Sequence, residues 1–162
     1  MKTIPLQTIL AATSLLMLAS CNYDVPATSE PTRSVDQRLL GDWVRFDPDE
    51  QKTDQLSVRK LDDAHYAVTV DGDIYRGFHT DHAKLPLVSL QDLNSANRKY
   101  VYYVWQLSPD ASELVLQRVA QEVIPESARD TATIQRLLAD HAGDPKLLDP
   151  KLVFARKTSH RR

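Results

Sequence analysis

The chain has 162 residues, a formal net charge of −2 and a single cysteine. This length suits one domain with its own hydrophobic core, and the absence of a basic excess argues against a nucleic-acid-binding protein. One cysteine offers no disulfide within the chain, so the folded body must depend on its core for stability.

The first 21 residues have the three regions of a secretory signal. Lys2 provides a positive charge, Ile4–Met17 form an apolar stretch, and the small residues Ala19 and Ser20 precede Cys21. The apolar stretch is shorter than the about 20 residues that a membrane-spanning helix needs. We therefore expect an exported chain.

The segment Leu18-Ala19-Ser20-Cys21 resembles the lipobox of bacterial lipoprotein precursors. The resemblance implies a signal peptide over residues 1–20 and lipidation of Cys21, which would anchor the mature chain to the membrane, since two or more acyl chains hold a protein there stably. Asn22 in place of Asp favours the periplasmic face of the outer membrane, as in the enterobacterial lipoproteins that this leader resembles. The alternative is an ordinary signal peptide with a chance cysteine.

The segment after the leader has the composition of a linker. Residues 21–35 carry Pro26 and Pro31 among small polar residues and show no apolar periodicity, which predicts a flexible tether. We expect a globular domain over residues 36–157 and a basic tail over residues 158–162.

Alternation of apolar and polar residues predicts strands through most of this domain. A helical turn over residues 35–40, capped by Ser34, precedes them, Asp71-Gly72-Asp73 is a hairpin signal, and Thr131–Ala142 has the apolar stripe of a helix that ends at Gly143. The sequence thus predicts a mainly β fold, with an antiparallel meander and one C-terminal α-helix. The expected strands are residues 41–46, 56–61, 65–70, 74–78, 85–90, 99–107, 113–119 and 151–156.

Gly41-x-Trp43 on the first strand, followed by a meander, a late helix and a last strand, resembles a small bacterial lipocalin-like (calycin-type) domain. The resemblance implies a barrel or half-barrel in which Gly41 and Trp43 are structural. It also implies that Trp43 packs across the closed end beneath a basic side chain, Arg156 or Lys151. The chain is short for a full eight-stranded cup, and its helix precedes the last strand, so we expect an incomplete or filled barrel.

The strand over residues 99–107 carries the candidate ligand contacts Tyr102, Tyr103 and Trp105. On a strand, Tyr103 and Trp105 share one face and Tyr102 lies on the other, so both faces are aromatic or apolar. Such a strand is either covered by core on both sides or meets a ligand or partner with one face.

Candidate catalytic chemistry is sparse. His79-Thr80-Asp81-His82 has metal-ligand residue types, but we interpret it as a solvated connection rather than a metal site. There is no Gly-x-Ser-x-Gly, no His-Glu-x-x-His and no Gly-rich phosphate loop. We expect no enzyme, cofactor or metal, but a membrane-anchored module for a small apolar or amphipathic ligand. The alternative is an interaction lipoprotein that docks another envelope protein and has no ligand pocket.

Overall fold

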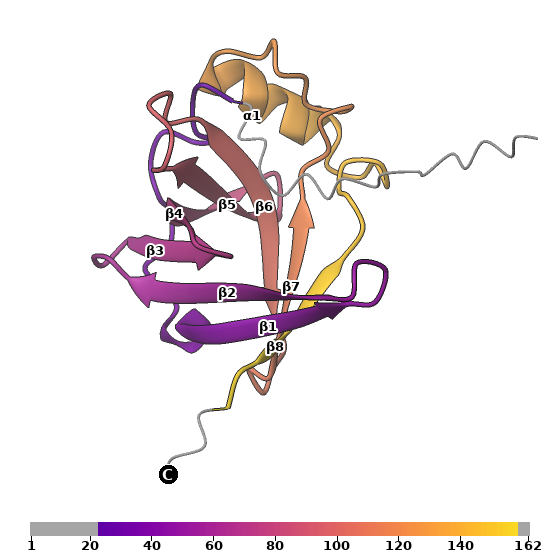
Figure 1. Ribbon diagram of the computed structural model, residues 1–162. Helices are drawn as coiled ribbons and strands as arrows, with labels where there is room; N and C mark the ends of the chain where they lie inside the picture. Colours follow the sequence, from indigo (N-terminus) through magenta and orange to yellow (C-terminus); the bar gives the residue numbers. More distant parts are fainter. Residues whose placement is uncertain (1–22, 159–162) are drawn as a thin grey trace, which may run out of the picture.

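The computed structural model describes residues 23–158, so the leader, Cys21 and residues 159–162 lie outside the described part. Eight antiparallel strands follow one another in sequence order, and β8 returns to pair with β1, which closes a barrel (Figure 1). The mainly β fold with one late helix is confirmed, and the barrel is complete. The elements are η1 (Gln37–Leu39), β1 (Gly41–Asp47), β2 (Lys52–Lys60), β3 (His65–Val70), β4 (Asp73–His82), β5 (Leu85–Asp92), β6 (Tyr100–Leu107), β7 (Glu113–Arg118), α1 (Thr131–Asp140) and β8 (Leu152–Arg156).

The two ends of the barrel differ, and we name them the closed end and the mouth. At the closed end lie η1, the start of β1 and the end of β8, where Trp43 pairs with Arg156. The β1–β2, β3–β4 and β5–β6 connections lie at the mouth, where the long segment that contains α1 also leaves β7 and enters β8.

The barrel interior holds the larger hydrophobic core. Alternate side chains of each strand point inward, as the period of two requires, and most of them are buried. The core residues are Val35, Leu39, Trp43, Leu56, Val58, Tyr66, Val68, Tyr75, Val88, Leu90, Val101, Tyr103, Trp105, Leu114, Leu116 and Phe154.

A second core lies outside the barrel wall, over β5 and β6. Ile134 and Leu138 of α1 are fully buried there, beside the outward-facing Leu87, Tyr102 and Val104. The helix predicted from its apolar stripe is therefore confirmed, although it ends at Asp140. Strand β6 is covered on both sides, which explains its aromatic and apolar residues on both faces.

Residues 23–35, which we name the strap, complete this second core and do not form the flexible tether expected from their composition. Tyr23 and Ala27 are fully buried, and the strap runs down one side of the barrel from beside α1 to η1 (indigo in Figure 1). The correction has a simple cause: the apolar residues of the strap pack on the outer wall of β5 and β6, a partner distant in the sequence.

Other corrections concern polar strand ends. β2 starts at Lys52 because residues 52–55 pair with β1, and β4 continues to His82 because residues 78–82 pair with β5. Neither extension has apolar alternation. Asp36 rather than Ser34 caps the helical turn, since its carboxylate accepts from Arg38 N. Within residues 23–158, no helix has the length and apolar character to cross a membrane.

Candidate functional site

The closed end is sealed by Trp43 and Arg156. Trp43 is fully buried, and its Nε1 donates to Leu39 O at 3.0 Å. The guanidinium carbon of Arg156 lies 4.1 Å from the centroid of the Trp43 ring, in cation–π geometry. The expected burial of Trp43 beneath a basic side chain of the last strand is confirmed, with Arg156 in that role.

Arg156 also ties three backbone segments together. Nε donates to Ala111 O at 2.7 Å, Nη1 donates to Leu40 O at 2.9 Å, and Nη2 donates to Arg38 O. Ala111 lies in the β6–β7 connection, Arg38 lies in η1, and Leu40 lies between η1 and β1, so one side chain closes this end of the barrel.

Gly41 makes room for that side chain. A Cβ at position 41 would lie 2.7 Å from Nη1 of Arg156, and the φ of +145° favours glycine. The structural role expected for Gly41 thus has two physical reasons, a close approach and a backbone conformation.

Above this seal, Tyr66, His79 and Trp105 form an aromatic cluster inside the barrel. The ring centroid of His79 lies 5.4 Å from that of Tyr66 and 5.8 Å from that of Trp105, and both pairs are arranged edge to face. Tyr66 Oη accepts from Asp36 N at 2.8 Å and lies 3.2 Å from Nδ1 of His79. Burial lowers the pKa of His79 to about 4, so His79 is neutral near pH 7, and Nδ1 then accepts from the Tyr66 hydroxyl.

The closed half of the interior is packed around this cluster. Nε2 of His79 and Nε1 of Trp105 are buried and have no hydrogen-bond partner among the described residues. Because both atoms are shielded from water, no open space lies against them. A ligand inside the barrel would therefore have to lie nearer the mouth.

The mouth half carries charged side chains on the inward-facing positions of β1 and β2. Arg45 lies between Asp54 and Asp47: its Nη2 is 2.6 Å from Asp54 Oδ2 and 2.8 Å from Asp47 Oδ2, and its Nε donates to Asp54 at 3.0 Å. The side chain of Asp54 is only 2% exposed and that of Arg45 14%. Lys52 lies at the rim, 3.3 Å from Asp54 and 2.8 Å from Asp71.

The pKa values of Arg45 and Asp47 favour the charged forms of these two side chains. Burial acts to lower the pKa of Arg45, but its hydrogen bonds and charge interaction with Asp54 and Asp47 outweigh burial and raise it. Burial likewise acts to raise the pKa of Asp47, but hydrogen bonds from Glu50 N, Asp49 N and Arg45 bring it below its usual value. The mouth therefore holds a stable ion pair rather than a proton donor or acceptor near neutral pH.

The three candidate ligand contacts are separated by the barrel wall. Tyr103 and Trp105 face the interior, where Tyr103 pairs with Arg118 towards the mouth and Trp105 belongs to the packed cluster. Tyr102 faces outward, stacks on Tyr23 at 4.4 Å between ring centroids and donates to Val25 O at 2.6 Å. The structure thus gives Tyr102 a role in holding the strap.

The charged mouth residues are the site features that sequence reasoning missed. Arg45 lies two residues after Trp43, and Asp54 lies two residues before Leu56, so both occupy inward-facing positions of their strands. This spacing of two from a core residue was the sequence signal that could have placed them inside the barrel. His79 was also missed, because the segment that contains it was taken for a solvated connection, whereas it lies in β4 with His79 buried.

Within β4, His79 faces the interior, whereas His82 donates to Gln135 O of α1 at 2.8 Å. Their side chains leave the strand on opposite faces. Among residues 23–158, no group of three or more His, Cys, Asp or Glu side chains is placed to hold a metal ion.

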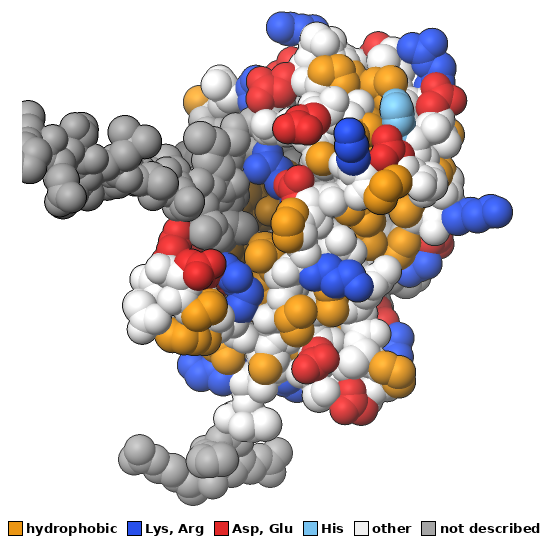
Figure 2. Space-filling model, turned by 90° about the vertical axis from the view of Figure 1, so that its right-hand side faces the viewer, with side chains coloured by type: hydrophobic (Ala, Val, Ile, Leu, Met, Phe, Trp, Pro, Cys, Tyr) orange, Lys and Arg blue, Asp and Glu red, His pale blue; other side chains and the backbone are white. Residues whose placement is uncertain are grey.

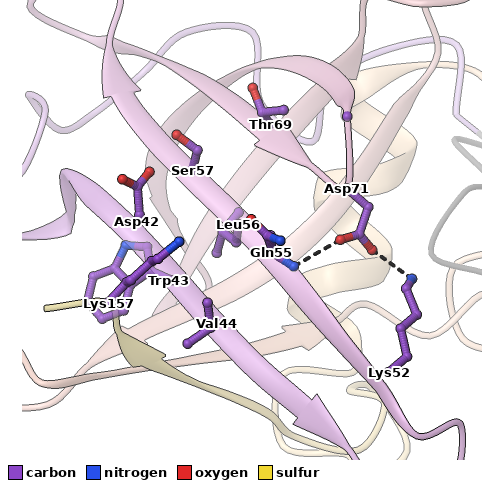
Figure 3. Close-up of a pocket in the computed structure, with 11 residues that line it drawn as sticks. Asp42, Trp43, Val44, Lys52, Gln55, Leu56, Ser57, Thr69, Asp71 and Lys157 are labelled. Atoms are coloured by element: carbon purple, nitrogen blue, oxygen red, sulfur yellow. Dashed lines mark hydrogen bonds and ion pairs between the residues drawn. The ribbon is translucent and has the colours of Figure 1, made fainter. Parts of the chain in front are cut away.

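A groove of about 510 Å³ lies outside the barrel, over β1, β2 and β3 (Figure 3). Asp42, Gln55, Ser57 and Thr69 project into it from the three strands, and Lys157 crosses near Trp43. At its mouth end, Asp71 accepts from Gln55 N and pairs with Lys52. Most of the residues that line this groove are polar, unlike the aromatic and aliphatic wall that an apolar ligand requires.

Comparisons of the chain with models of protein families, with curated proteins and with solved structures found no significant match.

Proposed function

We propose that this chain is a bacterial envelope lipoprotein, anchored through an acylated Cys21, whose barrel binds a small apolar or amphipathic ligand at its mouth without catalysing a reaction. The lipobox-like segment Leu18–Cys21 supports the anchor. The closed eight-stranded barrel supports the binding role, because barrels of this size are able to hold one small ligand.

The observation that carries the proposal is the polarity difference between the two halves of the interior. The closed half is an aromatic and aliphatic core sealed by Arg156 and Trp43. The mouth half holds the ion pairs of Arg45 with Asp47 and Asp54, and its inward-facing positions near the β3–β4 turn carry Val70 and Tyr75. An amphipathic ligand at the mouth would place its polar group at the charged network and its apolar part against the apolar and tyrosine side chains of the same end.

Stability alone is a weak reason for the charges at the mouth. A buried ion pair often contributes less than well-packed apolar side chains of similar volume, because both charges lose their hydration. Arg45 and Asp54 are nevertheless held almost out of water. A role in recognising a polar group accounts for charged side chains at these inward-facing positions.

The test is binding of the apolar fluorescent probe N-phenyl-1-naphthylamine to the leaderless chain, residues 22–162. Val70→Trp adds a ring at the inward-facing mouth end of β3, whereas Val153→Trp adds the same ring on the exposed outer face of β8. We expect Val70→Trp to abolish probe binding and Val153→Trp to leave it unchanged. The proposal fails if the wild-type chain binds no probe, or if both variants bind it equally well.

A second candidate function, docking of another envelope protein, is favoured by one exposed apolar pair. Phe46 is 59% exposed and Val153 45%, and each lies two residues beyond the β1–β8 pair Val44–Ala155 on the same outer face. On the face drawn in Figure 2, hydrophobic side chains lie scattered among charged ones. A photo-crosslinker at position 46 tests this candidate, with one at the similarly exposed Leu61 as the control.

A further inference from the structure

The strap fixes where the N-terminal end of the folded body lies. It starts beside the mouth end of β6 and descends along the outer wall to η1 at the closed end (Figure 1). Backbone groups fasten it along this whole path. From the mouth to the closed end, the contacts are Tyr23 with Tyr100, Ala27 N with Ser89 Oγ (3.1 Å), Thr32 N with His79 O (3.2 Å) and Val35 N with Asp63 O (2.9 Å).

Tyr23, the first described residue, is held most firmly. Its N–H donates to Tyr100 O at 3.1 Å, and its carbonyl accepts from Tyr100 N at 2.7 Å. Its hydroxyl donates to Ile124 O at 2.5 Å, its ring stacks on Tyr102, and the whole residue is 1% exposed. Displacing Tyr23 would break three hydrogen bonds and expose a large aromatic side chain, which makes this end of the strap part of the folded body.

Only Asn22 separates Tyr23 from Cys21 in the sequence. Two peptide units span at most about 7.6 Å between Cα atoms, whereas a flexible linker of about fifteen residues would have an end-to-end distance of about 20 Å and no preferred direction. An acylated Cys21 would thus place the lipid only two residues away from Tyr23, which pairs with the mouth end of β6.

We propose that the barrel lies directly on the bilayer with its mouth end towards the membrane, held in that orientation by the docked strap. The proposal rests on the proposed lipidation of Cys21. It also narrows the ligand class: a mouth held at the headgroups exchanges ligands with the bilayer, so the ligand is an amphiphile that resides in the membrane.

The strap, rather than surface charge, sets this orientation. Lys99 and Arg129 lie beside the start of the strap, but each approaches Asp24 at 3.6 Å, and Glu122 and Glu126 are exposed nearby. A rim of mixed charge attracts anionic lipids weakly, so we expect the orientation to persist when salt is raised.

The orientation is tested with the processed, full-length protein in phosphatidylethanolamine and phosphatidylglycerol vesicles that carry a headgroup nitroxide quencher. Ala96→Cys places a fluorophore on the β5–β6 connection at the mouth, and Asp63→Cys places one at the closed end, where Asp63 has a 96% exposed side chain. An eight-residue strand spans on the order of 25 Å, so the two sites lie far enough apart to distinguish. Acylation leaves Cys21 without a free thiol, so only the introduced cysteine is labelled.

We expect the label at position 96 to be quenched several-fold more than the label at position 63, at low and high salt alike. Insertion of about fifteen Gly and Ser residues between Asn22 and Tyr23 should make the two labels equal. Equal quenching without the insertion, or stronger quenching at position 63, overturns the orientation while leaving the anchor intact. Intact mass separates the two proposals, because a chain without acyl groups overturns the anchor and the orientation together.

Discussion

Replacing Arg156 by Met should show how strongly the barrel depends on the seal at its closed end. The change removes three hydrogen bonds to the carbonyls of Ala111, Leu40 and Arg38 and the cation above Trp43. Because Arg156 is partly exposed, we take about 1 kcal/mol for each hydrogen bond and about 1 kcal/mol for the cation–π contact. The free energy of unfolding should therefore fall by about 4 kcal/mol.

Urea denaturation of the leaderless chain, followed by tryptophan fluorescence, measures this loss. With an m-value of about 2 kcal/mol/M, the midpoint should fall by about 2 M. Arg156→Lys retains a cation but cannot reach three carbonyls at once. Its urea midpoint should therefore lie between those of the wild type and Arg156→Met. Lys151→Met removes the other basic residue considered for this role and should have little effect. If Arg156→Met has the same urea midpoint as the wild type, Arg156 does not stabilise the closed end of the barrel.

Three further predictions concern the anchor, the buried histidine and the helix. Cys21→Ser should abolish incorporation of a clickable fatty acid in cells, and equal labelling of variant and wild type would contradict lipidation. Since the pKa of His79 is about 4 when folded and 6.5 ordinarily, the unfolded chain binds more protons between these values. Stability should therefore fall by about 3 kcal/mol as the pH drops from 6.5 to 4. His79→Asn should flatten this pH dependence in denaturant titrations, and His141→Asn, which changes a half-buried histidine just after α1, is the control. Leu138→Asp places a charge in the buried contact of α1 and should remove hydrogen-exchange protection from the helix and strap, whereas Gln135→Ala should leave that protection unchanged.

The correct sequence-based predictions came from short-range patterns. Alternation predicts β3 because His65–Val70 is apolar at every second residue, and Asp71-Gly72 predicts the following hairpin because the structure requires positive φ at both residues. The stripe of Ile134 and Leu138 likewise predicts α1. These features depend on neighbouring residues alone, which is why the sequence suffices to predict them.

Prediction from the sequence failed for two kinds of segment: strand ends made of polar residues, and a linker that contains buried apolar residues. Residues 52–55 and 79–82 are strands because a neighbouring strand supplies their hydrogen bonds, and no apolar pattern marks them. The strap is ordered because Tyr23 and Ala27 find the outer wall of β5 and β6. The strap contacts join segments that are distant along the chain. The two strand extensions instead pair with the adjacent strand across a short turn, where backbone hydrogen bonds rather than an apolar pattern hold them.

By itself, the sequence determined the mainly β character, the order of the strands and the late helix, and the resemblance carried by Gly41-x-Trp43 implied a structural role for these two residues. Only the tertiary structure decided that the barrel closes, that Tyr102 lies outside while Tyr103 lies inside, and that charges occupy the mouth. The physical reason is that alternation separates the two faces of a strand without revealing which face is the interior. That choice depends on the curvature and closure of the whole sheet and on what covers its outer wall.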